Sequence, residues 1–266
     1  MKDASAKTNP LESVAVVLVH PRNSLNMGAV ARAMSNFGFA DLRLVAPYDV
    51  AYQKARSAVG PARDLLASAP VFDTLTEAIA DATQVVGTAS LENRHLQLDM
   101  RRLETGAAAI RRAISGNRKH PHKVALLFGS ERFGLTNTEM AHCHWLMRIP
   151  TREAHESMNL GQAVAICLYE LVRAPGIASE EDAEIRRQSA EAAPPPGVDP
   201  AQSDEVERVT TMLLGLLEDS GYVKPRIESS THLKIRRMIR RMKLNATDAQ
   251  NLLGMFKKIH WKMDQD

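Results

Sequence analysis

The chain has 266 residues, of which 44% are hydrophobic and 24% charged, and its net charge is +3. That length is enough for one large hydrophobic core and a small second unit. Its two cysteines, Cys143 and Cys167, exclude a disulfide framework, and no apolar run is long enough for a signal peptide or a membrane span. We therefore expect a cytoplasmic protein with no membrane attachment.

Apolar runs and helical patterns alternate along the first two thirds of the sequence. In chain order we expect a strand at Val14–Val19, a helix at Met27–Phe37, a strand at Leu42–Val45, a helix at Leu75–Ala82, a strand at Val85–Gly87, a helix at Met100–Ser115, a strand at Val124–Phe128, a helix at Thr136–His142, a strand at Leu146–Ile149 and a helix at Ser157–Arg173. This alternation predicts an α/β fold whose mainly parallel sheet carries helices on both faces.

The alternating pattern stops near Pro175, where the composition changes. Residues 179–205 carry eight acidic and two basic side chains, and they include the proline-rich stretch AAPPPGVDP. Three helical patterns follow, at about Gln202–Ser220, Ser229–Met242 and Ala246–Lys262. We expect an α/β domain over residues 1–174, a linker over 175–201 and a small all-α unit over 202–266.

The all-α unit is strongly basic. Residues 228–262 carry nine Lys and Arg against two Asp and Glu, and the run from Lys234 to Lys243 has six basic residues and no acid. This pattern favours binding to a polyanion such as RNA, although an ordinary solvated helix face is the alternative. The candidate RNA-binding residues are Lys234, Arg236, Arg237, Arg240, Arg241 and Lys243, with Ile235, Met238, Ile239 and Met242 expected to pack inward.

Polar, glycine-bearing stretches follow four of the five predicted strands. They read HPRNSLNMGAVAR, GTASLENR, GSERFGLTN and PTREAHESMNLGQ. The carboxyl ends of parallel strands are where open α/β sheets bind ligands, so we expect a site there. The nicotinamide fingerprint, the Walker loop and the hydrolase nucleophile elbow are all missing.

A metal site is not expected. His142, Cys143 and His144 stand together, but alternate residues of a helix do not converge on one ion, and no second ligand pair lies at zinc spacing. His20, His95 and His155 are interpreted as local hydrogen-bonding residues.

Three of these stretches carry a family resemblance. NMGAVARAM, LLFGSERFGLTN and IPTREAHESMNLGQAVAI resemble, in order, the three motifs of the SpoU class of SPOUT RNA 2′-O-ribose methyltransferases, over residues 13–173. Within that class the chain is most similar to the bacterial TrmJ type, including its basic helical C-terminal extension. The resemblance implies a trefoil knot, a homodimer, S-adenosyl-L-methionine as methyl donor, and tRNA as substrate, with nucleotide 32 of the anticodon loop as the acceptor.

The resemblance also assigns roles to individual residues. The catalytic motif positions are Arg32, Asn26, Glu131, Ser157 and Asn159. The positions expected to hold the methyl donor are Thr88, Ala89, Ser90, Gly129, Ile149, Glu156, Ser157 and Met158. Ser130 stands where the TrmJ type often has arginine, and Met158 where the motif usually has leucine.

Arg32 is the residue expected to act on the acceptor, from a position beside the donor at the strand-end cleft. A guanidinium stays protonated at ordinary pH, so we expect it to hold the acceptor phosphate or stabilise a developing alkoxide rather than to remove a proton. Three alternatives stay open: an rRNA acceptor, an inactive RNA-binding protein of the same fold, and a purely helix-capping role for Ser157 and Asn159.

Overall fold

The computed structural model describes residues 10–56, 62–89, 98–115, 122–152, 157–173, 199–223 and 228–263. Seven strands form one sheet in the order β3-β2-β1-β6-β4-β7-β5, and all the strand pairs are parallel. The strands are β1 (Val14–Val19), β2 (Asp41–Val45), β3 (Val71–Phe72), β4 (Gln84–Thr88), β5 (Met100–Arg102), β6 (Val124–Phe128) and β7 (Trp145–Arg148). The predicted parallel α/β fold is confirmed.

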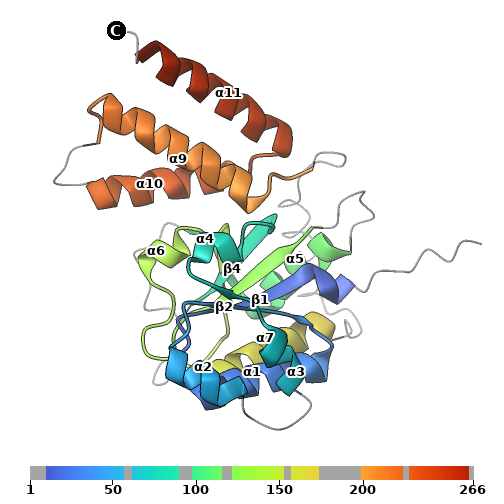
Figure 1. Cartoon of the computed structure of the whole chain (residues 1–266). Coiled ribbons are helices and arrows are strands. Elements are labelled where there is room, and N and C mark those ends of the chain that lie inside the picture. The colour runs from blue at the N-terminus through green and yellow to red at the C-terminus, as the bar shows by residue number, and fades with distance from the viewer. Residues whose placement is uncertain are drawn as a thin grey trace, which may run out of the picture.

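Helices cover both faces of this sheet (Figure 1). One layer holds α1 (Ser24–Phe37), α2 (Asp49–Arg56), α3 (Arg63–Ser68), α5 (Leu103–Ile114) and α7 (Leu160–Val172). The other layer holds two short helices, α4 (Leu75–Ala78) and α6 (Asn137–Met140), and a 3₁₀ turn at Pro10–Ser13 precedes β1. Every residue of β1 is buried, because alternate side chains pack into the two opposite cores.

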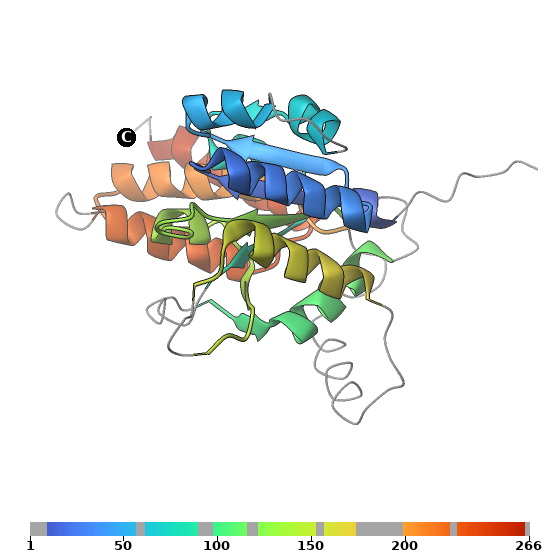
Figure 2. The ribbon, with the colours of Figure 1, turned by 90° about the horizontal axis from the view of Figure 1, so that it is seen from below.

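Helices α1 and α7 lie side by side across the outside of the first layer (Figure 2). Their contact depends on small residues. A Cβ at Gly161 would lie 2.7 Å from the Cβ of Ala29, so only glycine fits this approach. The close pairing places the start of α7 against the first turns of α1. Both helix starts form part of the candidate site.

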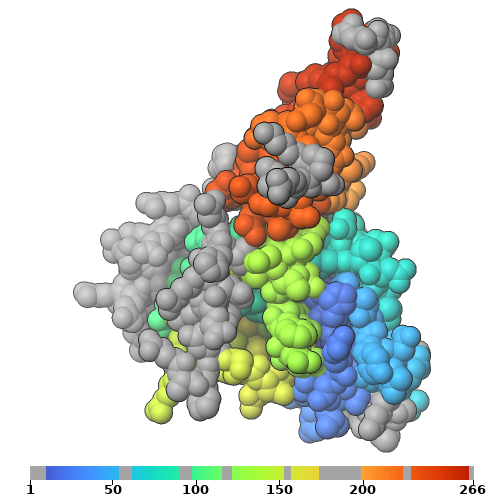
Figure 3. Space-filling view, turned by 90° about the vertical axis from the view of Figure 1, so that its left-hand side faces the viewer, coloured from blue at the N-terminus to red at the C-terminus, as the bar shows by residue number. Residues whose placement is uncertain are grey.

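The C-terminal helices α9 (Ser203–Asp219), α10 (Glu228–Arg241) and α11 (Ala246–Met263) form a separate helical unit that rises from one end of the α/β domain (Figure 3). It has its own small core, which includes Val206, Val209 and Ile239. Backbone bonds dock it: the N–H groups of Ser203 and Asp204 donate to the carbonyls of Ala82 and Ala80 at 2.8 and 3.1 Å.

The start of the helical unit lies slightly earlier than the sequence indicated. Pro200 forms an isolated bridge with Asn245, and the N–H of Ala201 donates to Leu244 O at 3.0 Å. Residues 199–201 therefore pair with the helical unit rather than standing free in a linker. The rest of the predicted linker, 175–198, lies outside the described residues.

The five predicted strands are confirmed to within one residue at each end, whereas four short elements were not predicted. The chain at Met100–Arg102 is a strand and not the first turn of a helix, and β3, α2 and α3 were missed. The trefoil knot stays a prediction, because residues 153–156, which lead into α7, lie outside the described part. Among the described helices, none combines the length and the apolarity that a membrane span requires.

Candidate active site

A cleft of about 250 Å³ opens at the carboxyl ends of β4, β6 and β7. Its apolar walls suit a flat ring and a thioether chain, and its rim is polar backbone and hydroxyl groups. The lining residues include six of the eight positions predicted to hold the methyl donor: Thr88, Ala89, Gly129, Ile149, Ser157 and Met158. The remaining two, Ser90 and Glu156, lie outside the described residues.

The loop after β6 forms one wall of the cleft and is unusually tight. Ser130 pairs with Gly134 across the turn, where the Gly134 N–H donates to Ser130 O at 2.8 Å and Gly134 has a φ of 63°. A Cβ on Gly129 would lie 1.9 Å from the carbonyl carbon of Gly134. Glycine is therefore required at Gly129 for the turn to close.

Glu131 extends from this turn to the start of α1. Its carboxylate accepts hydrogen bonds from the backbone N–H groups of Arg22 and Asn23, both at 3.0 Å, and from the side-chain amide of Asn26 at 3.1 Å. Partial burial alone would raise the pKa of Glu131, but the bonds from Asn26 and from backbone N–H groups outweigh it and lower the pKa below its usual value. Glu131 is thus ionised, and its carboxylate holds the loop after β6 against the start of α1.

Asn26 links all three motifs. Besides donating to Glu131, it accepts a hydrogen bond from the side-chain amide of Asn159 at 2.9 Å. The Oδ1 of Asn159 in turn accepts from the N–H groups of Gly161 and Gln162, which caps α7. Asn26, Glu131 and Asn159 therefore position the loops around the cleft, and the predicted capping role is confirmed for Asn159.

Ser157 lines the cleft but does not cap α7, because the capping side chain is that of Asn159, two residues later. Ser157 is exposed, and no hydrogen bond joins its hydroxyl to the described residues.

Arg32 is not brought into the cleft of its own chain. It is exposed on α1 and absent from the cleft lining, in a stripe with Leu25, Ala29 and Asn36. Beside this stripe, α7 exposes Ile166 and Tyr169, at 37% and 52%. Helix α1 directs Arg32 to the surface, so the cleft of a single chain does not include it, and its place beside the donor stays a prediction.

Sequence reasoning missed several residues that shape the cleft. Phe128, Leu135, Met147 and Leu160 supply its apolar walls, and Arg148 adds a positive charge. Phe128 and Met147 lie at or next to strand ends, which is the one sequence signal that could have identified them.

The His142–Cys143–His144 stretch has a structural role. The Nδ1 of His144 accepts a hydrogen bond from the N–H of Val85 at 2.9 Å. Burial, with Arg240 nearby, lowers the pKa of His144 to about 3, and burial raises that of the Cys143 thiol to about 12. Over the ranges that the structure describes, no three His, Cys, Asp or Glu side chains gather in a way that could hold a metal ion.

The predicted RNA-binding face of α10 is partly wrong. Arg240 is 1% exposed, with its Nη1 donating to Ser203 Oγ at 2.9 Å, and Arg236 forms an ion pair with Glu207 of α9. Lys234, Arg241 and Lys243 are exposed, and Arg237 is half-buried. Met238 and Met242, expected inside, are 39% and 52% exposed, because α10 packs on α9 through the face that carries Arg236, Ile239 and Arg240.

Comparisons with known proteins agree with the cleft and its motifs. Residues 13–169 match the SpoU rRNA Methylase family. The chain is 34% identical over 249 residues to a tRNA (cytidine/uridine-2′-O-)-methyltransferase TrmJ of Klebsiella pneumoniae, covering 94% of this chain and 97% of that protein. It is 35% identical over 250 residues to a protein of the same name from Yersinia pestis, with 94% and 92% covered.

A solved structure extends the likeness to both units. The crystal structure of TrmJ from Z. mobilis superposes with a TM-score of 0.75 at 28% identity, covering 92% of this chain and 98% of that one. The match to the family spans more than half of the sequence and contains the cleft and all three motifs. The chain belongs to the SpoU methylase family.

Proposed function

We propose that this protein is an enzyme that transfers a methyl group from S-adenosyl-L-methionine to a ribose 2′-hydroxyl in tRNA, at nucleotide 32 of the anticodon loop. The observation that carries the proposal is the cleft, since six of the residues assigned to donor binding line it together. Relatives that match over nearly the full chain are named tRNA (cytidine/uridine-2′-O-)-methyltransferases.

The cleft residues fit a bound S-adenosyl-L-methionine. Phe128, Leu135 and Leu160 offer an apolar surface for the adenine ring, and Thr88 and Ser157 offer hydroxyls at the rim. The donor supplies an electrophilic methyl group when bound. The protein excludes water through the apolar wall and fixes the loops through the Glu131–Asn26–Asn159 hydrogen bonds.

The acceptor oxygen must lose its proton as the new C–O bond forms. Arg32 provides a permanent positive charge that stabilises the developing negative charge or holds the adjacent phosphate, while a neighbouring group or water accepts the proton. Arg32 lies outside the cleft of its own chain, so it can act only at a cleft to which its exposed face is brought.

A homodimer through α1 and α7 supplies that arrangement. These helices expose Leu25, Ile166, Tyr169 and Val172, at 78%, 37%, 52% and 37%, in the same surface as Arg32. Exposed apolar side chains gathered on two neighbouring helices are typical of a protein interface. In this dimer Arg32 lies in the interface and serves the partner's cleft.

The experiment is methyl transfer from labelled S-adenosyl-L-methionine to bulk tRNA, followed by nuclease mapping of the labelled nucleotide. The expected product is a 2′-O-methylated residue at position 32, which is absent from reactions with Arg32→Ala. A parallel reaction uses rRNA as substrate, and label in rRNA alone would assign the enzyme to that RNA. Donor binding without any transfer to RNA would favour an inactive RNA-binding protein of the same fold.

A further inference from the structure

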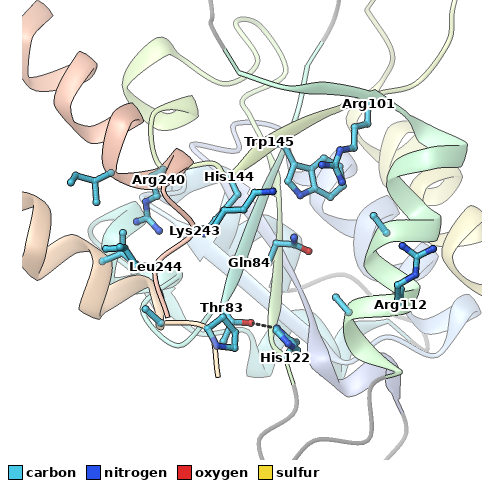
Figure 4. Close-up of a pocket in the computed structure, with 16 residues that line it drawn as sticks. Thr83, Gln84, Arg101, Arg112, His122, His144, Trp145, Arg240, Lys243 and Leu244 are labelled. Atoms are coloured by element: carbon cyan, nitrogen blue, oxygen red, sulfur yellow. Dashed lines mark hydrogen bonds between the residues drawn. The ribbon is translucent and has the colours of Figure 1, made fainter. Parts of the chain in front are cut away.

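A second cavity lies between the α/β domain and the helical unit, beside the amino ends of β4 and β7, whose carboxyl ends line the cleft. Its volume is about 140 Å³, close to that of a cavity that holds one benzene molecule. Arg240 and Lys243 lie on one side, Trp145, Arg101 and Arg112 lie on the other, and Gln84 lies between them (Figure 4).

The charged side chains that line this cavity are all positive. Four of its lining residues are cationic, namely Arg101, Arg112, Arg240 and Lys243, and none is a carboxylate. Some of this charge is compensated behind the wall, since Asp99 pairs with Arg101 at 2.8 Å and Glu207 lies 3.8 Å from Arg240. A positive surplus remains at the cavity itself, because the exposed Lys243 forms no ion pair within the described residues.

Several buried polar atoms in the wall have no hydrogen-bond partner among the described residues. They are Nε and Nη2 of Arg240, Nε1 of Trp145 and Oε1 of Gln84. Arg240 is 1% exposed and Trp145 is 3% exposed, so solvent outside the cavity does not serve these groups. Burial lowers the pKa of Arg240 to about 10 despite the nearby Glu207, which leaves a charged but poorly compensated guanidinium.

We infer that this cavity binds a phosphate group, either free or carried by a larger phosphorylated molecule. A hydrogen phosphate offers several acceptor oxygens to the N–H groups of Arg240 and Trp145 and to the Lys243 ammonium. Its single O–H matches the unpartnered acceptor of Gln84. Because the walls come from both units, the bound phosphate joins α10 to β4 and β7 and stabilises the docking of the helical unit.

Phosphate binding here does not depend on the proposed methyl transfer. A tryptophan in the cavity wall, Trp145, can report binding by its fluorescence. The sequence has two tryptophans. Trp261 is 50% exposed on α11, so Trp261→Phe in the full-length protein leaves Trp145 as the single fluorophore. Inorganic phosphate is titrated into this protein at constant ionic strength, with chloride as the control ion, and the melting temperature is followed in parallel.

The expected result is a saturable change in Trp145 fluorescence and a rise in melting temperature with phosphate but not with chloride. Lys243→Gln and Arg101→Gln, from opposite walls, should each weaken the apparent affinity about tenfold or more. Lys257→Gln is the matched control, because Lys257 is an exposed lysine of the same helical unit, on α11, and does not line the cavity.

A further arm separates the two sources of phosphate. If the occupant is a phosphate of tRNA, saturating tRNA abolishes the fluorescence response to inorganic phosphate. If the occupant is a free phosphorylated molecule, the response persists with tRNA bound. The inference is overturned if phosphate gives no saturable change, or if Lys243→Gln and Lys257→Gln behave alike, since the cavity then has no specific site for phosphate.

Discussion

Asn26 and Glu131 are joined by a hydrogen bond of 3.1 Å that connects the first turn of α1 to the loop after β6. The two residues are 105 positions apart in the sequence. Through Asn159 the same chain of bonds reaches the start of α7, so a change at either residue is transmitted to two walls of the cleft.

Glu131→Gln should weaken this linkage. The amide keeps one acceptor oxygen but turns an NH₂ group toward one of the N–H donors of Arg22 and Asn23. We expect a loss of about 0.5–1.5 kcal/mol in the free energy of unfolding, because these hydrogen bonds are exposed, and weaker donor binding. Urea denaturation and calorimetry with S-adenosylhomocysteine measure the two effects.

The control is Glu104→Gln, whose carboxylate forms an exposed pair with Arg102 at 3.4 Å and no other ion pair with the described residues. It should change the free energy of unfolding by less than about 0.5 kcal/mol. Equal effects of the two substitutions would remove the positioning role assigned to Glu131.

Gly129→Ala should abolish donor binding. The new methyl group would overlap the backbone of Gly134 at 1.9 Å, so the turn must open and the wall of the cleft must move. Gly28→Ala is the control, because a Cβ at Gly28 has open space around it. Calorimetry with S-adenosylhomocysteine should give no heat for the first variant and normal binding for the second, and normal binding by both would contradict the close approach.

The buried His144 should make stability depend on pH. Its pKa is lowered to about 3 by burial, whereas an unfolded histidine titrates near pH 6.5. The unfolded chain therefore binds more protons between these values, so stability is complete above about pH 6.5 and falls as the pH decreases toward 3. We expect a loss on the order of 1 kcal/mol between pH 7 and pH 5, measured by urea denaturation.

His144→Asn tests the origin of that slope. An asparagine oxygen can take the place of Nδ1 and accept from the Val85 N–H, but it does not titrate. The variant should lose less stability than the wild type between pH 7 and pH 5. An unchanged slope would assign the pH dependence to other groups, such as His142, whose pKa burial lowers to about 4.

The exposed cations of α10 should hold RNA. Reversing Lys234 and Arg241 to glutamate should weaken tRNA binding and flatten its dependence on salt, while donor binding stays intact. Arg63→Glu, an exposed residue on α3, is the control for the change of charge. Filter binding over a range of salt concentrations measures the slope, and an unchanged slope in the double variant would exclude this face.

Arg32 should act across the proposed dimer. Arg32→Ala should bind donor normally but turn over about 10²–10³ times more slowly, and Ala89→Phe should fill the cleft, which Ala89 lines. Mixing the two inactive variants should restore about a quarter of wild-type activity, because half of the random dimers are mixed and each mixed dimer holds one complete site. A mixture without activity would show that Arg32 serves its own chain.

The sequence predicted the parts of the fold that have strong local patterns. The buried strands β1 and β6 are continuous apolar runs and were located to the residue, whereas β3 and β5 are short edge strands without such a run. Six of the eight positions predicted to hold the donor line the cleft, since ligands in these folds meet the strand ends.

The sequence alone could not show which face of α10 is buried. Periodicity shows that Arg236 and Arg240 share a face, but only the position of Glu207 on α9 decides that this face is covered. In the same way the spacing of α1 placed Arg32 correctly on a helix without showing that it points away from the sheet. Which surface a neighbour covers depends on contacts between residues far apart in the chain.

The two backbone hydrogen bonds from Ser203 and Asp204 to Ala82 and Ala80 also constrain how the protein is made. They satisfy N–H groups in the first turn of α9 with carbonyls of the α/β domain, so that turn is completed only against a folded domain. During synthesis the N-terminal domain leaves the ribosome first, so it can fold before the helical unit docks on its surface. Because only main-chain atoms take part, every substitution except proline keeps these donors, and the angle between the two units can persist while the surrounding sequence diverges.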